Sequence, residues 1–231
     1  MTNSQVIVHK SVLMQRLLDS VVRGHYLHTS GIVPVSRAQR LVDKFADRYG
    51  IHKTMNQRAY AKRHGHANAR LFLYARSGET ALQWWLLATP GTGAVHELER
   101  LGNAHENRQR LQIENEYELV RRTRPSKHGG GQVWSWRMTR ETYRNWRNTI
   151  REDCRAPDTG RITQTLGTLY RAPGFSGIRH QIGNLVVLAR REWRRYHGNK
   201  KELILPPSLP YLERLPTHTV PLAEWCEMAD R

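Results

Sequence analysis

The chain has 231 residues, and its seven Trp and nine Tyr exclude a disordered polypeptide, because disordered segments are poor in aromatic residues. It contains two cysteines and no apolar run long enough to cross a bilayer. This excludes a disulfide scaffold, a zinc site built on cysteine pairs and a transmembrane helix, so a cytoplasmic setting is expected. The formal net charge of +17 predicts a polyanion, DNA or RNA, as the partner in preference to a membrane.

The first quarter of the chain is predicted to be helical. Apolar residues at helical spacing predict a helix over residues 6–23, and residues 25–34 are interpreted as a connector. Ser36 is expected to cap a second helix that Gly50 closes, and a short third helix is predicted over residues 54–63. The solvent face of the second helix is expected to carry a basic row of Arg37, Arg40, Lys44 and Arg48.

Two antiparallel hairpins are predicted next, because runs of aromatic and aliphatic residues flank turn signals. The first pairs residues 71–75 with residues 82–88, and the second pairs residues 117–123 with residues 132–138. Together they are expected to form one antiparallel sheet of about four strands. The second of these strands is apolar on both faces, so its two tryptophans are expected in the core.

Three helices are predicted after the hairpins, over residues 139–153, 161–171 and 176–197. Each has an apolar stripe that is expected to be buried. On the first and third helices the residues predicted to be buried are Tyr143, Trp146, Ile150, Ile178, Ile182, Leu185, Ala189, Trp193 and Tyr196. Residues 202–231 are expected to form a proline-rich strap and a short last helix over residues 222–229.

Arginine residues gather on the first and third of these helices. Residues 137–201 contain 15 Lys or Arg against 5 Asp or Glu, whereas an ordinary solvated face, which is the alternative interpretation, carries charges of both signs. Because residues three and four apart share a helix face, the arginines form rows beside the apolar stripes. The rows predicted to bind nucleic acid contain Arg140, Arg144, Arg147 and Arg151 on the first helix, and Arg179, Arg190 and Arg194 with the adjacent Arg191 and Arg195 on the third.

The loop of the second hairpin is expected to add local contacts. No acidic residue lies between Val120 and Arg140, and the glycines at 129–131 predict a mobile tip. The predicted nucleic-acid contacts of this hairpin are Arg121, Arg122, Arg124, Lys127, His128 and Arg137. Trp134 and Trp136 share one sheet face by the two-residue period, and they are expected either to pack under a helix or to stack on bases.

Histidine residues support an alternative, catalytic interpretation. His64 and His66 flank a glycine, and His96 precedes a glutamate on a predicted short helix. Together with His128 they are candidate acid–base groups for a metal-independent nuclease or RNA-processing enzyme. No third ligand lies at a spacing typical of zinc sites, so neither a metal nor another cofactor is expected. A binding protein without chemistry of its own is favoured, because neighbours in sequence do not establish catalytic geometry.

The sequence as a whole predicts one α+β unit over residues 1–201, with N-terminal helices, a roughly four-stranded antiparallel sheet and a C-terminal helical layer. A helical module that ends near residue 65 is the alternative division. The expected function is DNA or RNA binding within a bacterial replication, transfer or defence assembly. A third interpretation is a structural subunit of a ribonucleoprotein or protein complex, in which the basic face meets an acidic partner.

Overall fold

The structure is a computed structural model, and it describes residues 4–76, 79–124, 126, 129–198, 202–209 and 211–229. Helices and strands are both abundant, which confirms the predicted α+β class. The chain divides into two compact units, the first containing residues 1–111 and 214–231 and the second containing residues 112–213. This division differs from the expected single unit and from the alternative boundary near residue 65. The C-terminal segment belongs to the first unit because it pairs with the N-terminal strand.

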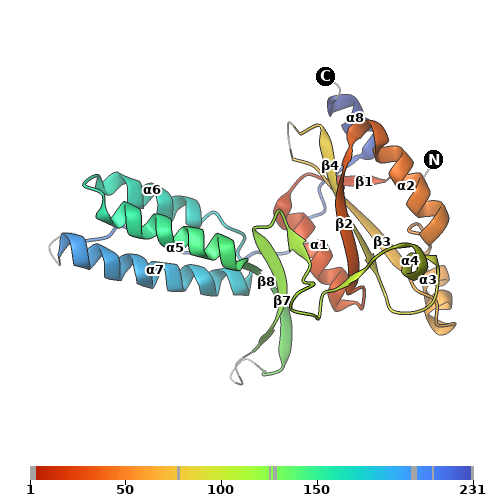
Figure 1. Ribbon diagram of the computed structural model, residues 1–231, viewed down its shortest axis with the longest axis horizontal. Coiled ribbons are helices and arrows are strands. Elements are labelled where there is room, and N and C mark those ends of the chain that lie inside the picture. The colour runs from red at the N-terminus through yellow and green to blue at the C-terminus, as the bar shows by residue number, and fades with distance from the viewer. Residues whose placement is uncertain are drawn as a thin grey trace. The chain divides into compact units, whose positions relative to one another are not determined.

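A six-stranded mixed sheet forms the centre of the first unit, in the order β5-β2-β4-β3-β1-β9. Its strands are β1 (Gln5–Ile7), β2 (Leu27–Pro34), β3 (Ala69–Tyr74), β4 (Ala81–Ala88), β5 (Gly102–Asn103) and β9 (Thr219–Pro221). The pair of β1 and β3 is parallel, and the other pairs are antiparallel (Figure 1). The central strand β4 buries Leu82, Leu86 and Leu87 completely, which accounts for its apolar residues on both faces.

The strand β2 corrects the interpretation of residues 25–34 as a connector. It pairs with β4 along its whole length, from Leu27 opposite Ala88 to Pro34 opposite Ala81. Polar and small residues interrupt its apolar pattern, so the neighbouring strand rather than local propensity keeps it extended. A Cβ on Gly31 would come within 2.8 Å of the Trp84 indole, which explains a glycine in mid-strand.

The helices of the first unit are α1 (Lys10–Val22), α2 (Val35–Tyr49), α3 (Met55–Arg63), α4 (Ala94–Leu98) and α8 (Leu222–Ala229). The predicted helix over residues 6–23 therefore begins later, because its first residues form β1. On α2, Phe45 is buried in the core and Gly50 closes the helix in the left-handed region, as expected. The residue that precedes α2 is Pro34, so the predicted cap at Ser36 is wrong.

The second unit combines a three-stranded antiparallel sheet with three helices. Its elements are β6 (Gln112–Ile113), β7 (Tyr117–Thr123), β8 (Gln132–Met138), α5 (Arg140–Arg155), α6 (Thr159–Leu169) and α7 (Ser176–His197). Both predicted hairpins are confirmed as strand pairs, but they belong to separate sheets, so the expected single four-stranded sheet is wrong. The physical reason is that β2 and β1 already occupy the outer edges of the first hairpin.

The helices α5 and α7 run parallel to each other. At their starts, the Gln181 side chain accepts a hydrogen bond from the Met138 amide at 2.7 Å and donates one to the Met138 carbonyl at 3.1 Å. At their ends, the His197 ring is hydrogen bonded to the Cys154 carbonyl at 2.9 Å. The helix α6 packs against α5, and the three helices lie side by side (Figure 1). Most of the predicted apolar residues are buried, although Tyr143 and Trp146 are half-buried and Tyr196 is exposed.

The close approach of α7 to β8 depends on Gly177. The amide of Gly177 donates a hydrogen bond to the Ser135 hydroxyl at 3.0 Å, and a Cβ on Gly177 would lie 2.3 Å from the Trp136 carbonyl oxygen. We expect Gly177→Ala to lower the free energy of unfolding by about 1–3 kcal/mol, because the helix must move away. Gly183→Ala, on the same helix in open space, is expected to be neutral or to stabilise by up to about 1 kcal/mol. Urea denaturation of both variants measures this difference, and equal effects would contradict the close packing.

Candidate nucleic-acid interface

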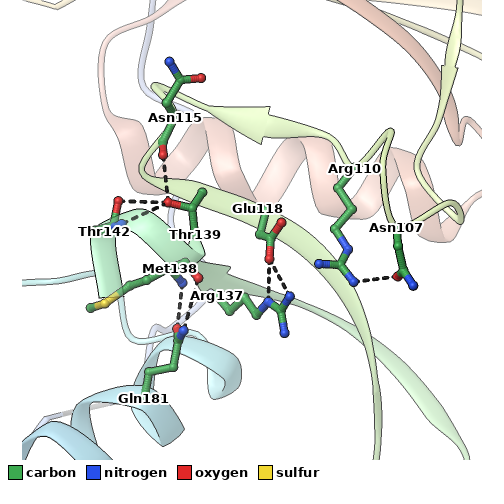
Figure 2. A network of polar contacts seen from close by, with 9 residues as sticks. All are labelled: Asn107, Arg110, Asn115, Glu118, Arg137, Met138, Thr139, Thr142 and Gln181. Carbon is green, nitrogen blue, oxygen red and sulfur yellow. Dashed lines mark hydrogen bonds and ion pairs between the residues drawn. The ribbon is translucent and has the colours of Figure 1, made fainter. Parts of the chain in front are cut away.

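The arginine row of α5 lies on the solvent side of the helix. Arg140, Arg144 and Arg147 are exposed and Arg151 is half-buried. The start of the helix is fixed by Thr139, whose hydroxyl accepts a hydrogen bond from the Thr142 amide at 3.3 Å (Figure 2). The same hydroxyl donates to the Asn115 carbonyl at 2.9 Å. The Thr139 hydroxyl thus links the start of α5 to the turn between β6 and β7. These bonds fix the position of the first turn of the helix that carries the four arginines.

The helix α7 has two arginine rows, and one of them lies beside α5. A shallow groove of about 200 Å³ separates α5 from α7, and its lining comprises Tyr143, Arg147, Asn184, Val187, Leu188 and Arg191. Arg195 follows Arg191 by one turn and shares its face of the helix. Arg147 and Arg191 therefore stand on opposite sides of one groove. Sequence analysis missed Asn184 and Val187. They precede Arg191 at helical spacing, which places them on the same face of the helix.

The other row of α7 lines a different hollow. Arg190 and Arg194 border a space of about 1140 Å³, together with Trp193 of the same helix and residues 202–207 of the proline-rich strap. The sequence placed Arg179 in this row as well. Its guanidinium carbon lies 3.8 Å from the centroid of the Tyr211 ring, so this side chain is held inside the unit by a cation–π contact.

The charges of these rows are largely uncompensated. In the part of the chain that the structure describes, no carboxylate lies within 4.0 Å of Arg140, Arg144, Arg147, Arg151, Arg190, Arg194 or Arg195. Arg191 is the exception among the arginines of these rows, because its guanidinium lies 3.3 Å from the carboxylate of Glu192. Like charges one turn apart destabilise a helix by about 0.2–0.5 kcal/mol per pair, and a bound polyanion would remove that repulsion.

The predicted contacts of the second hairpin have different surroundings. Arg137 is paired with Glu118 across β7 and β8 at 2.6 Å, which makes it part of the sheet (Figure 2). The Arg121 guanidinium lies 5.9 Å from the centroid of the Trp134 ring on the opposite strand. Arg124 is exposed at the base of the loop, and Arg122 is half-buried. The predicted contacts Lys127 and His128 lie outside the described residues.

Three of the histidines proposed as acid–base groups, His64, His66 and His96, lie in the first unit, and the fourth, His128, lies outside the described residues. The His64 ring donates to the Tyr60 carbonyl at 2.9 Å and stacks on the Tyr60 ring. The His66 ring is hydrogen bonded to the Thr92 hydroxyl at 3.1 Å, and the His96 ring donates to the Thr89 carbonyl at 3.0 Å. Each of these three rings is therefore hydrogen bonded to a backbone carbonyl or a hydroxyl. None of these bonds is to a carboxylate, the partner that would orient the ring for acid–base catalysis.

Metal ligands do not gather around these histidines either. Among the described residues, no group of three or more His, Cys, Asp or Glu side chains is placed to hold a metal ion. Within the same residues, no helix combines the length and the apolar character needed to cross a membrane. Comparison with protein families, with curated proteins and with solved structures finds no match for the chain.

Proposed function

We propose that this protein binds DNA or RNA, and that it holds the phosphate backbone along the surface of α5 and α7. This α5–α7 surface comprises Arg140, Arg144, Arg147, Arg151, Arg191 and Arg195. The observation that carries the proposal is the parallel packing of the two helices, which places Arg147 and Arg191 on opposite sides of one groove, each within a row of arginines on its own helix. Guanidinium groups suit phosphates because they donate two hydrogen bonds in a fixed plane.

The dimensions of the surface suit a nucleic-acid backbone. From Arg140 to Arg151 the row advances by eleven residues, or about 16 Å along the helix axis. Phosphates of one strand follow each other by about 3.4 Å along the axis of B-DNA, so several phosphates can meet the row together. The lining residues of the groove include no carboxylate, and Glu192 beside Arg191 is the one acidic partner of the six arginines among the described residues.

A charge reversal tests this proposal. Arg144→Glu combined with Arg147→Glu is expected to weaken binding at least about tenfold, a loss of about 1.4 kcal/mol, because each change replaces an attraction by a repulsion. The matched control is Arg37→Glu combined with Arg40→Glu on α2, where both arginines are exposed and the change in net charge is identical. Fluorescence anisotropy with labelled single-stranded DNA, duplex DNA and RNA measures the affinity, and melting temperatures confirm that the variants are folded.

The outcomes of this experiment separate the alternatives. A comparable loss in both double variants would show that net charge alone drives binding, and it would contradict the α5–α7 surface. The same mixtures contain EDTA, so any cleaved substrate would support the metal-independent nuclease in place of a binding protein. His64, His66 and His96 give that enzyme no geometric support, because each ring is hydrogen bonded to a backbone carbonyl or a hydroxyl.

A further inference from the structure

The first unit contains a basic cluster of its own, formed by Arg23, His25, Arg58 and Arg70. Arg23 follows α1, His25 precedes β2, Arg58 lies on α3 and Arg70 lies on β3. Arg23 is exposed and the other three side chains are half-buried. Three segments that are separated along the chain, the connector between α1 and β2, the helix α3 and the strand β3, therefore bring three guanidinium groups and an imidazole close together.

Two buried polar residues hold this cluster in position. The Arg70 guanidinium donates to the hydroxyl of Ser20 at 3.2 Å, and the Ser20 carbonyl accepts the backbone amide of His25 at 3.0 Å. The Asn68 side chain donates to the backbone carbonyl of Arg58 at 3.1 Å. Ser20 and Asn68 are both buried. The Arg70 guanidinium and the backbone at His25 and Arg58 are thus fixed by buried residues of the first unit.

Buried polar atoms of the cluster lack a hydrogen-bond partner. The Nε atom of Arg58 and both ring nitrogens of His25 are shielded from solvent and make no hydrogen bond. Leaving such a group unsatisfied costs about 1–3 kcal/mol, and buried polar groups in folded proteins are paired in the great majority of cases. An acceptor that reaches the Nε–H group of Arg58 and the N–H group of the His25 ring would therefore stabilise the first unit.

The electrostatics of the cluster favour a negatively charged acceptor. Burial lowers the pKa of Arg70, and the charges of Arg58 and Arg23 lower it further. Asp19 acts in the opposite direction, but its carboxylate already accepts a hydrogen bond from Arg214 at 2.6 Å. Burial lowers the pKa of His25 to about 4, and the positive charges of Arg70, Arg58 and Arg23 contribute to the shift.

We propose that the cluster of Arg23, His25, Arg58 and Arg70 is a binding site for a phosphate group. Phosphate has more acceptor oxygens than a carboxylate and carries up to two negative charges, so it can satisfy several guanidinium groups and an imidazole together. The phosphate belongs either to a nucleic acid or to the free anion. The site stands independently of the α5–α7 surface, because all of its residues lie in the first unit.

The His25 ring provides a direct readout of the bound anion. A phosphate beside the ring favours its protonated form, so the pKa of His25 is expected to rise from about 4 toward the ordinary value of 6.5. For the singly charged form of phosphate, binding therefore strengthens as the pH falls through this interval, because protonation of the ring adds a positive charge to the site. NMR titration of the imidazole nitrogens in the full chain measures the midpoint in chloride and in inorganic phosphate at equal ionic strength.

A pair of variants on one helix controls for general charge effects. Inorganic phosphate at pH 7 is expected to raise the melting temperature of the wild-type chain above its value in chloride, because a ligand of the folded state stabilises it. Arg58→Gln is expected to abolish this rise, whereas Arg63→Gln, an exposed change on the same α3, is expected to retain it. Each variant is compared with itself in the two salts, so a lower basal stability does not affect the conclusion.

The source of the phosphate is decided by three probes. They are inorganic phosphate, a short single-stranded oligonucleotide with a 5′-phosphate, and the same oligonucleotide without it. A shift of the His25 midpoint by inorganic phosphate alone assigns the site to the free anion, and a shift by either oligonucleotide assigns it to nucleic acid. The absence of a shift with all three probes would overturn the proposal. The variant with Arg144→Glu and Arg147→Glu should respond to inorganic phosphate normally, so failure of the α5–α7 surface is recognised separately.

Discussion

The affinity of the protein for DNA or RNA is expected to fall by roughly a thousandfold or more between about 50 and 200 mM monovalent salt. The reason is counterion release, because each arginine that neutralises a phosphate displaces a condensed cation into solution. The α5–α7 surface offers six arginines, and about six phosphate contacts correspond to a loss of this size. The exposed arginines have few carboxylate partners of their own, so most of their charge is available to the ligand.

Anisotropy titrations at several salt concentrations measure this dependence. The slope of log affinity against log salt is expected to become less steep by about two in the variant with Arg144→Glu and Arg147→Glu, because two contacts are removed. The control with Arg37→Glu and Arg40→Glu should keep the slope of the wild type. An affinity that does not change with salt would contradict a surface that binds phosphates.

Replacing Trp136 by Ala is expected to lower the free energy of unfolding by about 3–5 kcal/mol. The Trp136 side chain is 0% exposed and lies on β8, against which α7 packs. The substitution removes its packing contacts and leaves a buried cavity. A loss of this size approaches the whole stability of many small domains, so the second unit is expected to unfold at a much lower concentration of urea.

Trp134 provides the matched control on the same strand. It lies two residues earlier and is half-buried, with the Arg121 guanidinium above its ring. Trp134→Ala is therefore expected to cost clearly less stability than Trp136→Ala in urea denaturation followed by circular dichroism. If Trp134→Ala leaves the protein folded but weakens binding, this ring stacks on bases. Equal losses of stability in the two variants would contradict the different burial of the two rings.

Local sequence patterns predicted much of the second unit. The apolar residues of α5, α6 and α7 recur with the period of a helix, and their positions located each helix to within about two residues. The hairpin of β7 and β8 was predicted in the same way, from two apolar runs around a glycine-rich turn. In these elements each residue's conformation follows from near neighbours, so the pattern is contained in a short stretch of sequence.

Long-range pairing decided the first unit instead. The strand β2 carries a polar and small middle section, and it becomes a strand because β4 offers a full-length partner. The strands β1 and β9 are three residues each, and more than 200 residues separate them in the sequence. Such short segments have almost no intrinsic preference, so their extended form depends on the assembled sheet.

The candidate sites show the same distinction. The sequence by itself determined that arginines form rows on two helices, because spacing along a helix fixes which residues share a face. The tertiary structure alone decided that Arg191 rather than Arg190 lies across the groove from Arg147, because that depends on how α5 and α7 pack. It also brought Arg23, His25, Arg58 and Arg70 together from three segments of the chain. The folding of the sheet and its helices, and no local pattern, sets the distances between these segments.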